Sequence, residues 1–146
     1  MSFLLILSTG LYLAFILYII AGLFRHNEQP ITSTEETPFV SVVIAARNEE
    51  QNLPDLIQDL VNQEYPLDKL EVIIVDDRST DSTPTILIEA AENFAFIKQI
   101  RVDDRAVDMT HKKHALSLGI NASKGEVIVC TGADCRVGKL WVSSMA

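Results

Sequence analysis

The sequence predicts an α/β domain with a mainly parallel sheet, preceded by one transmembrane helix. Three observations lead to this prediction. Residues 3–24 are uncharged and almost entirely apolar. After residue 37, short runs of β-branched residues alternate with segments whose apolar residues recur at helical spacing. Polar clusters follow three of the short runs directly, which is where parallel sheets with helices on both faces hold their ligands.

The apolar run at residues 3–24 is long enough for a membrane helix. At about 1.5 Å per residue, roughly 22 residues extend about 33 Å, and a hydrocarbon core is about 30 Å thick. A cleaved signal peptide is the alternative, but it needs a basic start, a shorter apolar core and a small-residue cleavage site. The two residues before the run carry no side-chain charge, and the run ends in Gly22 and two large apolar residues. We therefore expect residues 1–25 to be a retained single-pass anchor.

Charge and composition indicate where the residues after the apolar run are located and which protein classes they exclude. Arg25 directly follows the apolar run, and basic residues at a membrane end favour the cytoplasmic side, so we expect a cytoplasmic soluble domain. The net charge of −8 belongs entirely to the residues after the run, which argues against a nucleic-acid-binding protein. Cys130 and Cys135 have no CxxC or Cys/His spacing around them and read as reduced packing residues. Residues 26–37 are polar, contain Pro30 and lack an apolar period, as expected of a linker.

Strand and helix patterns alternate after this linker. Residues 39–46 are rich in Val and Ile, so we expect a buried strand. The next apolar residues fall along one helix face, at Leu53, Leu56, Ile57, Leu60 and Val61. Asn48 or Asn52 can cap this helix, and Pro54 fits its first turn.

The pattern repeats to the end of the chain. Residues 70–75 form a second predicted strand, and Thr83 followed by Pro84 is typical of an N-cap with proline at the first helical position. We expect that helix to reach Phe94. The remaining predicted elements are a strand at 96–102, a helix at 112–122 and a strand at 127–130. This βαβαβαβ order with short connections implies a mainly parallel sheet covered on both faces.

Three polar clusters follow predicted strands and are the candidate site. They comprise residues 46–50 (ARNEE), 76–82 (DDRSTDS) and 131–135 (TGADC). The carboxyl ends of parallel strands lie at one edge of a sheet, so these clusters are expected to lie near one another.

The strings VSVVIAARNEE, EVIIVDDRSTDST and KGEVIVCTGADC, with Lys112 and the pair Ala115-Leu116 between the last two, resemble family 2 of the glycosyltransferases. The resemblance covers about residues 38–141. It implies a GT-A type nucleotide-binding sandwich over residues 38–146. It also implies the inverting transfer of a sugar from a nucleotide-diphosphate sugar, with a UDP-sugar favoured, to an unknown glycan, lipid or protein acceptor.

The resemblance also implies roles for residues in the first two clusters. Ala45, Arg47 and Asp77 would line the uridine site, because a carboxylate can accept the imide N–H of uracil. Asp76 would contribute to nucleotide binding or instead fix the loop, and both aspartates could simply cap a helix or form a turn. Lys112 would lie near the donor phosphates. His111 and His114, which lack a third metal ligand, are expected to be surface residues.

The third cluster corresponds to the family's DxD motif, with one departure. Asp134 matches the second, metal-facing position, whereas Gly132 stands where the first Asp is expected. Carboxylate oxygens suit Mg²⁺ or Mn²⁺, so the resemblance implies a divalent cation held by Asp134. Glycine at the first position would weaken the contact to the sugar or to the ion unless water replaces the carboxylate, and it could adopt a positive φ.

Two further expectations concern the extent of the chain. Inverting transfer needs a general base for the acceptor hydroxyl, and in this family that base lies well beyond the DxD segment. We therefore expect a donor-binding half, incomplete at the C-terminus and without the catalytic base. A membrane-tethered nucleotide-sugar-binding fragment without catalysis is the alternative. A receiver-type signalling domain fits poorly, because its acidic pair follows the first strand and here the pair follows the second.

Overall fold

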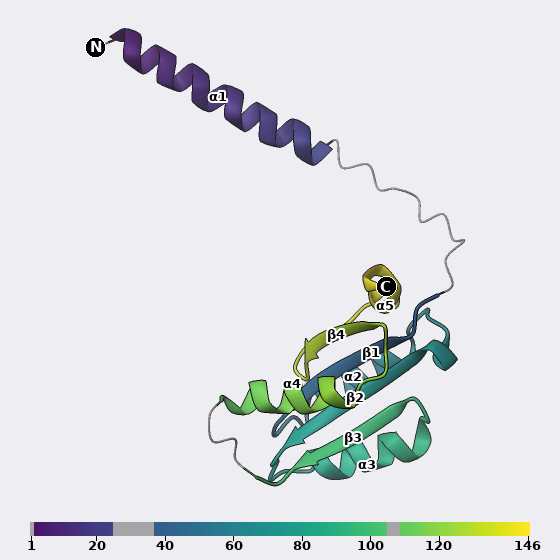
Figure 1. The fold of residues 1–146 in the computed structure, drawn as a ribbon. Coiled ribbons are helices and arrows are strands. Elements are labelled where there is room, and N and C mark those ends of the chain that lie inside the picture. The colour runs from purple at the N-terminus through teal and green to yellow at the C-terminus, as the bar shows by residue number, and fades with distance from the viewer. Residues whose placement is uncertain (1, 25–36, 105–108) are drawn as a thin grey trace. The chain divides into compact units, whose positions relative to one another are not determined.

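The computed structural model of the protein describes residues 2–24, 37–104 and 109–146 (Figure 1). The chain divides into two compact units, Met1–Glu36 and Thr37–Ala146. Except for Thr37, the predicted linker at residues 26–37 lies outside the described residues.

The first unit contains α1, a helix of 23 residues at Ser2–Phe24. Large apolar side chains are exposed along it, including Phe3, Leu4, Ile6, Leu7, Leu11, Leu13, Phe15 and Leu17. Over the part of the chain that the structure describes, however, no helix proves both long enough and apolar enough to cross a membrane. The transmembrane helix in the predicted fold class and the single-pass anchor at residues 1–25 are therefore not confirmed.

The second unit is built on one parallel sheet of four strands (Figure 1). The strands are β1 (Val40–Ala46), β2 (Leu70–Asp77), β3 (Ile97–Val102) and β4 (Val127–Gly132). Their spatial order is β3-β2-β1-β4, and every neighbouring pair runs parallel. The predicted α/β class with a parallel sheet and βαβαβαβ order is confirmed.

The register brings three strand ends together. Ala46 pairs with Asp76, and Ala45 pairs with Gly132, so β2 and β4 both end beside the end of β1. The first two crossovers lead from β1 towards β3, whereas β4 lies on the other side of β1. Such a reversal of strand order opens a crevice at the carboxyl edge of a parallel sheet.

Helices cover both faces of the sheet. On one face, α2 (Leu53–Val61) and α3 (Thr83–Asn93) bury Leu56, Leu60 and Leu87 in the larger core. On the other face, α4 (His111–Ala122) packs its Ala115 against Ile73 and Val75. A Cβ at Gly119 would collide with the Val43 side chain, so this glycine lets α4 lie close to the sheet.

The structure differs from the sequence prediction mainly at element ends. Both β2 and β4 continue two residues past their apolar runs, because neighbouring strands still pair with them there: Asp77 pairs with Val102 of β3, and Gly132 pairs with Ala45 of β1. The N-cap of α3 is Ser82, and Thr83 is the first helical residue instead of the predicted cap. Two short helices were not predicted, η1 (Leu67–Lys69) and α5 (Trp141–Met145).

Candidate functional site

A cleft of about 270 Å³ opens at the carboxyl edge of the sheet. We call it the carboxyl-edge cleft. Segments far apart in the sequence supply its lining: the end of β1, the end of β2, the start of α4 and the turn after β4. The lining residues are Ala45, Ala46, Arg47, Glu49, Asp77, His111, Lys112, Gly132, Ala133 and Asp134.

Six of the seven residues singled out from the sequence line this cleft: Ala45, Arg47, Asp77, Lys112, Gly132 and Asp134. Asp76 does not. Neighbouring residues of a strand point to opposite faces, so Asp76 and Asp77 have different surroundings.

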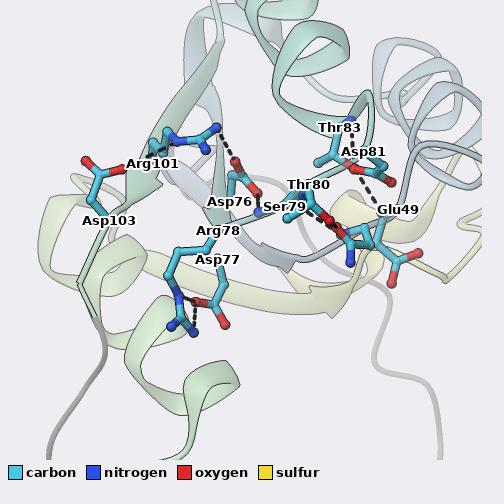
Figure 2. Close-up of polar contacts among 11 residues, drawn as sticks. Glu49, Asp76, Asp77, Arg78, Ser79, Thr80, Asp81, Thr83, Arg101 and Asp103 are labelled. Carbon is cyan, nitrogen blue, oxygen red and sulfur yellow. Dashed lines mark hydrogen bonds and ion pairs between the residues drawn. The ribbon is translucent and has the colours of Figure 1, made fainter.

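The Asp77 carboxylate lies at the wall of the cleft and is 5% exposed. Its Oδ1 accepts a hydrogen bond of 2.9 Å from Arg78 Nε (Figure 2). Its Oδ2 lies 3.8 Å from the guanidinium of Arg47, which is beyond hydrogen-bond distance. One carboxylate oxygen is thus engaged by Arg78, while the other retains capacity to accept a hydrogen bond from a ligand.

Arg78 links two walls of the cleft. Besides binding Asp77, its guanidinium lies 3.0 Å from Nδ1 of His111, the first residue of α4. Lys112 follows on the same helix and also lines the cleft. The start of α4, with its two basic residues, is therefore held beside the end of β2.

Asp76 stabilises the loop after β2. Its side chain is fully buried. Oδ1 accepts a hydrogen bond of 3.0 Å from the Ser79 backbone N–H, and Oδ2 pairs with Arg101 at 3.2 Å (Figure 2). Arg101 also contacts Asp103 at 3.4 Å. Asp76 thus occupies the loop-fixing position, one of the two roles left open by the sequence.

The turn after β4 presents Asp134 to the cleft. Gly132 does not have a positive φ, so its backbone would accept a side chain, although an added Cβ would meet the Asp134 carboxylate first. The Asp134 side chain is exposed, and the Cys135 thiol makes a weak contact with its Oδ1 at 3.8 Å.

A divalent cation such as Mg²⁺ takes about six oxygen ligands, from the protein, a bound ligand or water. No group of three or more His, Cys, Asp or Glu side chains that could hold a metal ion occurs among the described residues. Asp134 alone suits an ion that takes its other ligands from diphosphate oxygens and water, as Mg²⁺ often does. The residues fit such a shared site and do not fit an all-protein metal cage.

The segment that follows Asp134 is fastened to α2. Arg136 binds the Asp59 carboxylate through two hydrogen bonds of 2.6 and 2.9 Å and reaches Asp55 at 2.8 Å. The hydrogen bond from Arg136 is the main reason that the pKa of Asp59 lies below its ordinary value. Gln63 is buried and bonds both the Gly138 carbonyl, at 2.8 Å, and the Val142 N–H, at 2.9 Å. The turn bearing Asp134 therefore has a fixed support.

The family follows from a comparison with known sequences. Residues 41–146 match the family model described as glycosyl transferase family 2. The chain belongs to glycosyl transferase family 2. This confirms the resemblance seen in the sequence.

Relatives of this family 2 chain are longer than the chain itself. It is 39% identical over 113 residues to beta-monoglucosyldiacylglycerol synthase from Nostoc sp. (strain PCC 7120), which covers 77% of the chain and 23% of that protein. The structure resembles mannosyltransferase PcManGT from Pyrobaculum calidifontis in complex with GDP-Man and Mn²⁺. The TM-score is 0.62 at 32% identity, over 69% of this chain and 29% of that one.

A third similarity is to S. aureus TarS (residues 1–349) in complex with UDP, with a TM-score of 0.59 at 25% identity, over 72% of this chain and 30% of that one. The chain thus spans less than a third of each of these proteins. The structural similarities confirm an α/β fold of the GT-A type.

Four lining residues of the family 2 domain were not among the site residues predicted from the sequence: Ala46, Glu49, His111 and Ala133. His111 was expected to be a surface residue; its side chain is exposed, yet it lines the cleft and contacts Arg78. Its position next to Lys112 was the available signal. Glu49 also lines the cleft. It belongs to the first polar cluster, but the sequence does not show that Glu49 faces the cleft and Glu50 does not.

Proposed function

We propose that this chain is the donor-binding part of an inverting glycosyltransferase whose donor is a nucleotide-diphosphate sugar, specifically a UDP-sugar. One observation carries the proposal. Six residues that the family resemblance assigns to the donor come from four separate segments and line one cleft at the carboxyl edge of the sheet.

Asp77 is proposed to hold the base. Its Oδ2 can accept the imide N–H of uracil while Oδ1 stays bonded to Arg78. Ala45 and Arg47 lie along the same wall of the cleft, where the small side chain of Ala45 leaves room for a planar base. The UDP in the complex of TarS, a structure 25% identical to this chain, supports this choice of nucleotide.

Lys112 and Asp134 are proposed to serve the diphosphate. Lys112 contributes a positive charge from the start of α4, and Asp134 would hold Mg²⁺ or Mn²⁺ together with the phosphate oxygens. When bound, the cation offsets negative charge on the departing diphosphate. The Mn²⁺ in the complex of the related mannosyltransferase supports a divalent cation.

We further propose that the general base for the acceptor hydroxyl lies outside this donor-binding part. The chain's coverage of 23–30% of the compared proteins supports this. We also propose that α1 associates with a membrane, because exposed apolar side chains line it. The acceptor is a glycan, a lipid or a protein, and the name of the Nostoc relative supports a lipid.

The test is a calorimetric titration of the chain with UDP and GDP in the presence of Mn²⁺. UDP should bind more tightly than GDP. Asp77→Ala should weaken UDP binding by about 1–3 kcal/mol, the usual cost of losing a hydrogen bond to a charged group. Asp68→Ala is the matched control, because Asp68 is an exposed aspartate in η1 and does not line the cleft.

Folding of each variant is checked through the fluorescence of Trp141, the single tryptophan of the chain. If folded Asp77→Ala binds UDP as tightly as the parent, Asp77 is not part of the nucleotide site. If the parent binds neither nucleotide, the proposed function is wrong.

A further inference from the structure

The loops after β1 and β2 are joined by a reciprocal pair of hydrogen bonds. The Asn48 backbone N–H donates to Ser79 Oγ at 2.9 Å, and the Thr80 backbone N–H donates to Asn48 Oδ1 at 2.8 Å. Each loop therefore supplies one backbone donor and one side-chain acceptor. We call this pair the loop clasp.

The backbone at the clasp is unusual. Asn48 and Arg78 both have φ of 55°, and among the described residues no other non-glycine residue has a positive φ. Asparagine is one of the few side chains that tolerate this left-handed conformation. Asn48 therefore meets two demands at once, a left-handed backbone and a side-chain oxygen for the Thr80 N–H.

One end of the clasp is anchored in the sheet. Ser79, which accepts from Asn48, is itself held through its N–H by the buried carboxylate of Asp76. Arg101 of β3 pairs with the other oxygen of that carboxylate. The position of Ser79 is thus fixed by the sheet, and the clasp transmits that position to the loop after β1.

The clasp lies between residues that line the cleft. Arg47 and Glu49 flank Asn48 on one loop, and Asp77 lies two residues before Ser79 on the other. Asn48 itself does not line the cleft. The Arg47 guanidinium and the Asp77 carboxylate, which are 3.8 Å apart, thus belong to the two segments that the clasp joins.

A second set of contacts joins the same loops farther along and provides an internal control. The Glu50 N–H donates to Asp81 Oδ2 at 3.2 Å, and the Ser82 N–H donates to Glu50 Oε2 at 2.9 Å. Neither Glu50 nor Asp81 lines the cleft. These contacts share the chemistry of the clasp but lie beyond the residues that face a ligand.

We propose that Asn48 is a positioning residue for the nucleotide: its side chain and its left-handed backbone set the spacing of Arg47 and Asp77 in the carboxyl-edge cleft. The inference rests on the proposed function, since it concerns the same site. It predicts that nucleotide affinity depends on an acceptor oxygen and a tolerated backbone at position 48, and does not depend on contact between Asn48 and the nucleotide.

The experiment compares Asn48→Ala, Asn48→Gly and Asn48→Asp with the parent. Alanine loses both the acceptor and the backbone tolerance, glycine loses only the acceptor, and aspartate retains both. UDP affinity in the presence of Mn²⁺ should fall about tenfold in Asn48→Ala, fall less in Asn48→Gly and stay within about threefold of the parent in Asn48→Asp. Glu50→Ala, the control, should leave UDP affinity unchanged even where it lowers the melting temperature.

Amide hydrogen exchange at Thr80 provides a measurement that does not require nucleotide. Exchange should accelerate about tenfold in Asn48→Ala and return towards the parent rate in Asn48→Asp. Parent-like UDP affinity in Asn48→Ala, or an Asn48→Asp variant as weak as Asn48→Ala, would overturn the inference. If the parent binds no UDP, the proposed function fails, and amide exchange alone tests the loop clasp. An unchanged exchange rate at Thr80 in Asn48→Ala then overturns the clasp. An accelerated rate in Asn48→Ala that returns towards the parent rate in Asn48→Asp supports the clasp.

Discussion

Glu71 is a buried carboxylate with no part in the cleft. It lies on β2, is 2% exposed, and accepts hydrogen bonds of 2.6 Å from Ser41 Oγ, Lys98 Nζ and the Lys124 N–H. Burial by itself would raise the pKa of Glu71, but the hydrogen bonds from Lys98, Ser41 and Lys124 outweigh it, and the pKa lies below its ordinary value. The charged form of Glu71 therefore stabilises the fold.

The lowered pKa of Glu71 predicts how stability depends on pH. A carboxyl whose pKa is lower in the folded state contributes stability above its unfolded pKa, about 4.3 for glutamate, and loses it as the pH falls through the folded pKa. We expect the urea midpoint of the parent to fall more steeply below about pH 4.3 than that of Glu71→Gln, which lacks this titration. Trp141 fluorescence measures the urea midpoint of the parent and of Glu71→Gln at each pH. Midpoints that fall in parallel for the two proteins would contradict the prediction.

Gly132 and Asp134 determine how a cation would bind. With Asp134 as the carboxylate of the turn, we expect Mn²⁺ to bind poorly to the free chain and well together with UDP, because the phosphates supply the missing ligands. Asp134→Asn should remove the gain in UDP affinity that Mn²⁺ gives. Gly132→Asp should increase that gain, since the backbone at Gly132 is not left-handed and the exposed Asp134 side chain can move aside.

UDP titrations with Mn²⁺ and with EDTA, run on the parent and both variants, distinguish these cases. Thermal unfolding of Gly132→Asp reveals whether the added side chain strains the turn. Equal UDP affinity in EDTA and Mn²⁺ for the parent, with no effect of Asp134→Asn, would mean that Asp134 is only a turn residue.

At the scale of elements, strand interiors could be predicted and strand ends could not. The Val and Ile run of β1 is buried almost throughout, which its composition indicates directly. In contrast, β4 continues through Thr131 and Gly132 because β1 still pairs with it there, and a pairing partner is not encoded locally. The short helix α5 is equally dependent on distant contacts, since Gln63 of the chain after α2 accepts from its Val142 N–H.

The helix α1 presents exposed apolar side chains and carries no acidic residue in its first turn and no basic residue in its last. We expect the full chain to sediment with membranes, to stay there after a high-salt wash and to be released by detergent, because apolar contacts are not screened by salt. The chain of residues 37–146, which lacks α1, is the matched control and should remain in the supernatant. Intact full chain in the supernatant would contradict this prediction.

At the scale of the whole molecule, the two units predict independent behaviour. All residues of the two apolar cores and all lining residues of the carboxyl-edge cleft belong to Thr37–Ala146. We therefore expect residues 37–146 alone to fold and to bind UDP within about twofold of the full chain, the range typical of changes that touch neither core nor site. A loss of the unfolding transition or of UDP binding on truncation would show that residues 1–36 contribute to the fold or to the site.

The location of the candidate site could be predicted from the topology, but the roles of the individual residues within it could not. Parallel strands bring their carboxyl ends together, so three polar clusters after strands predicted one shared cleft. Asp76 and Asp77 have the same chemistry, and they differ only in which face of the sheet they point to. Assigning Asp76 to loop support required its contacts with Ser79 and Arg101, which lie in segments that the local sequence does not connect.

The position of β4 has a consequence for the order in which the fold assembles. Contacts between β1 and β2 join residues about 30 positions apart, as Ser41 and Glu71 do, whereas those between β1 and β4 span about 87, as Val40 and Val127 do. Closing the longer loop costs more chain entropy, so we expect β1, β2 and β3 to associate first and β4 to join last. During synthesis, the wall that carries Arg47 and Asp77 would then be complete while the strand leading to Asp134 is still emerging from the ribosome.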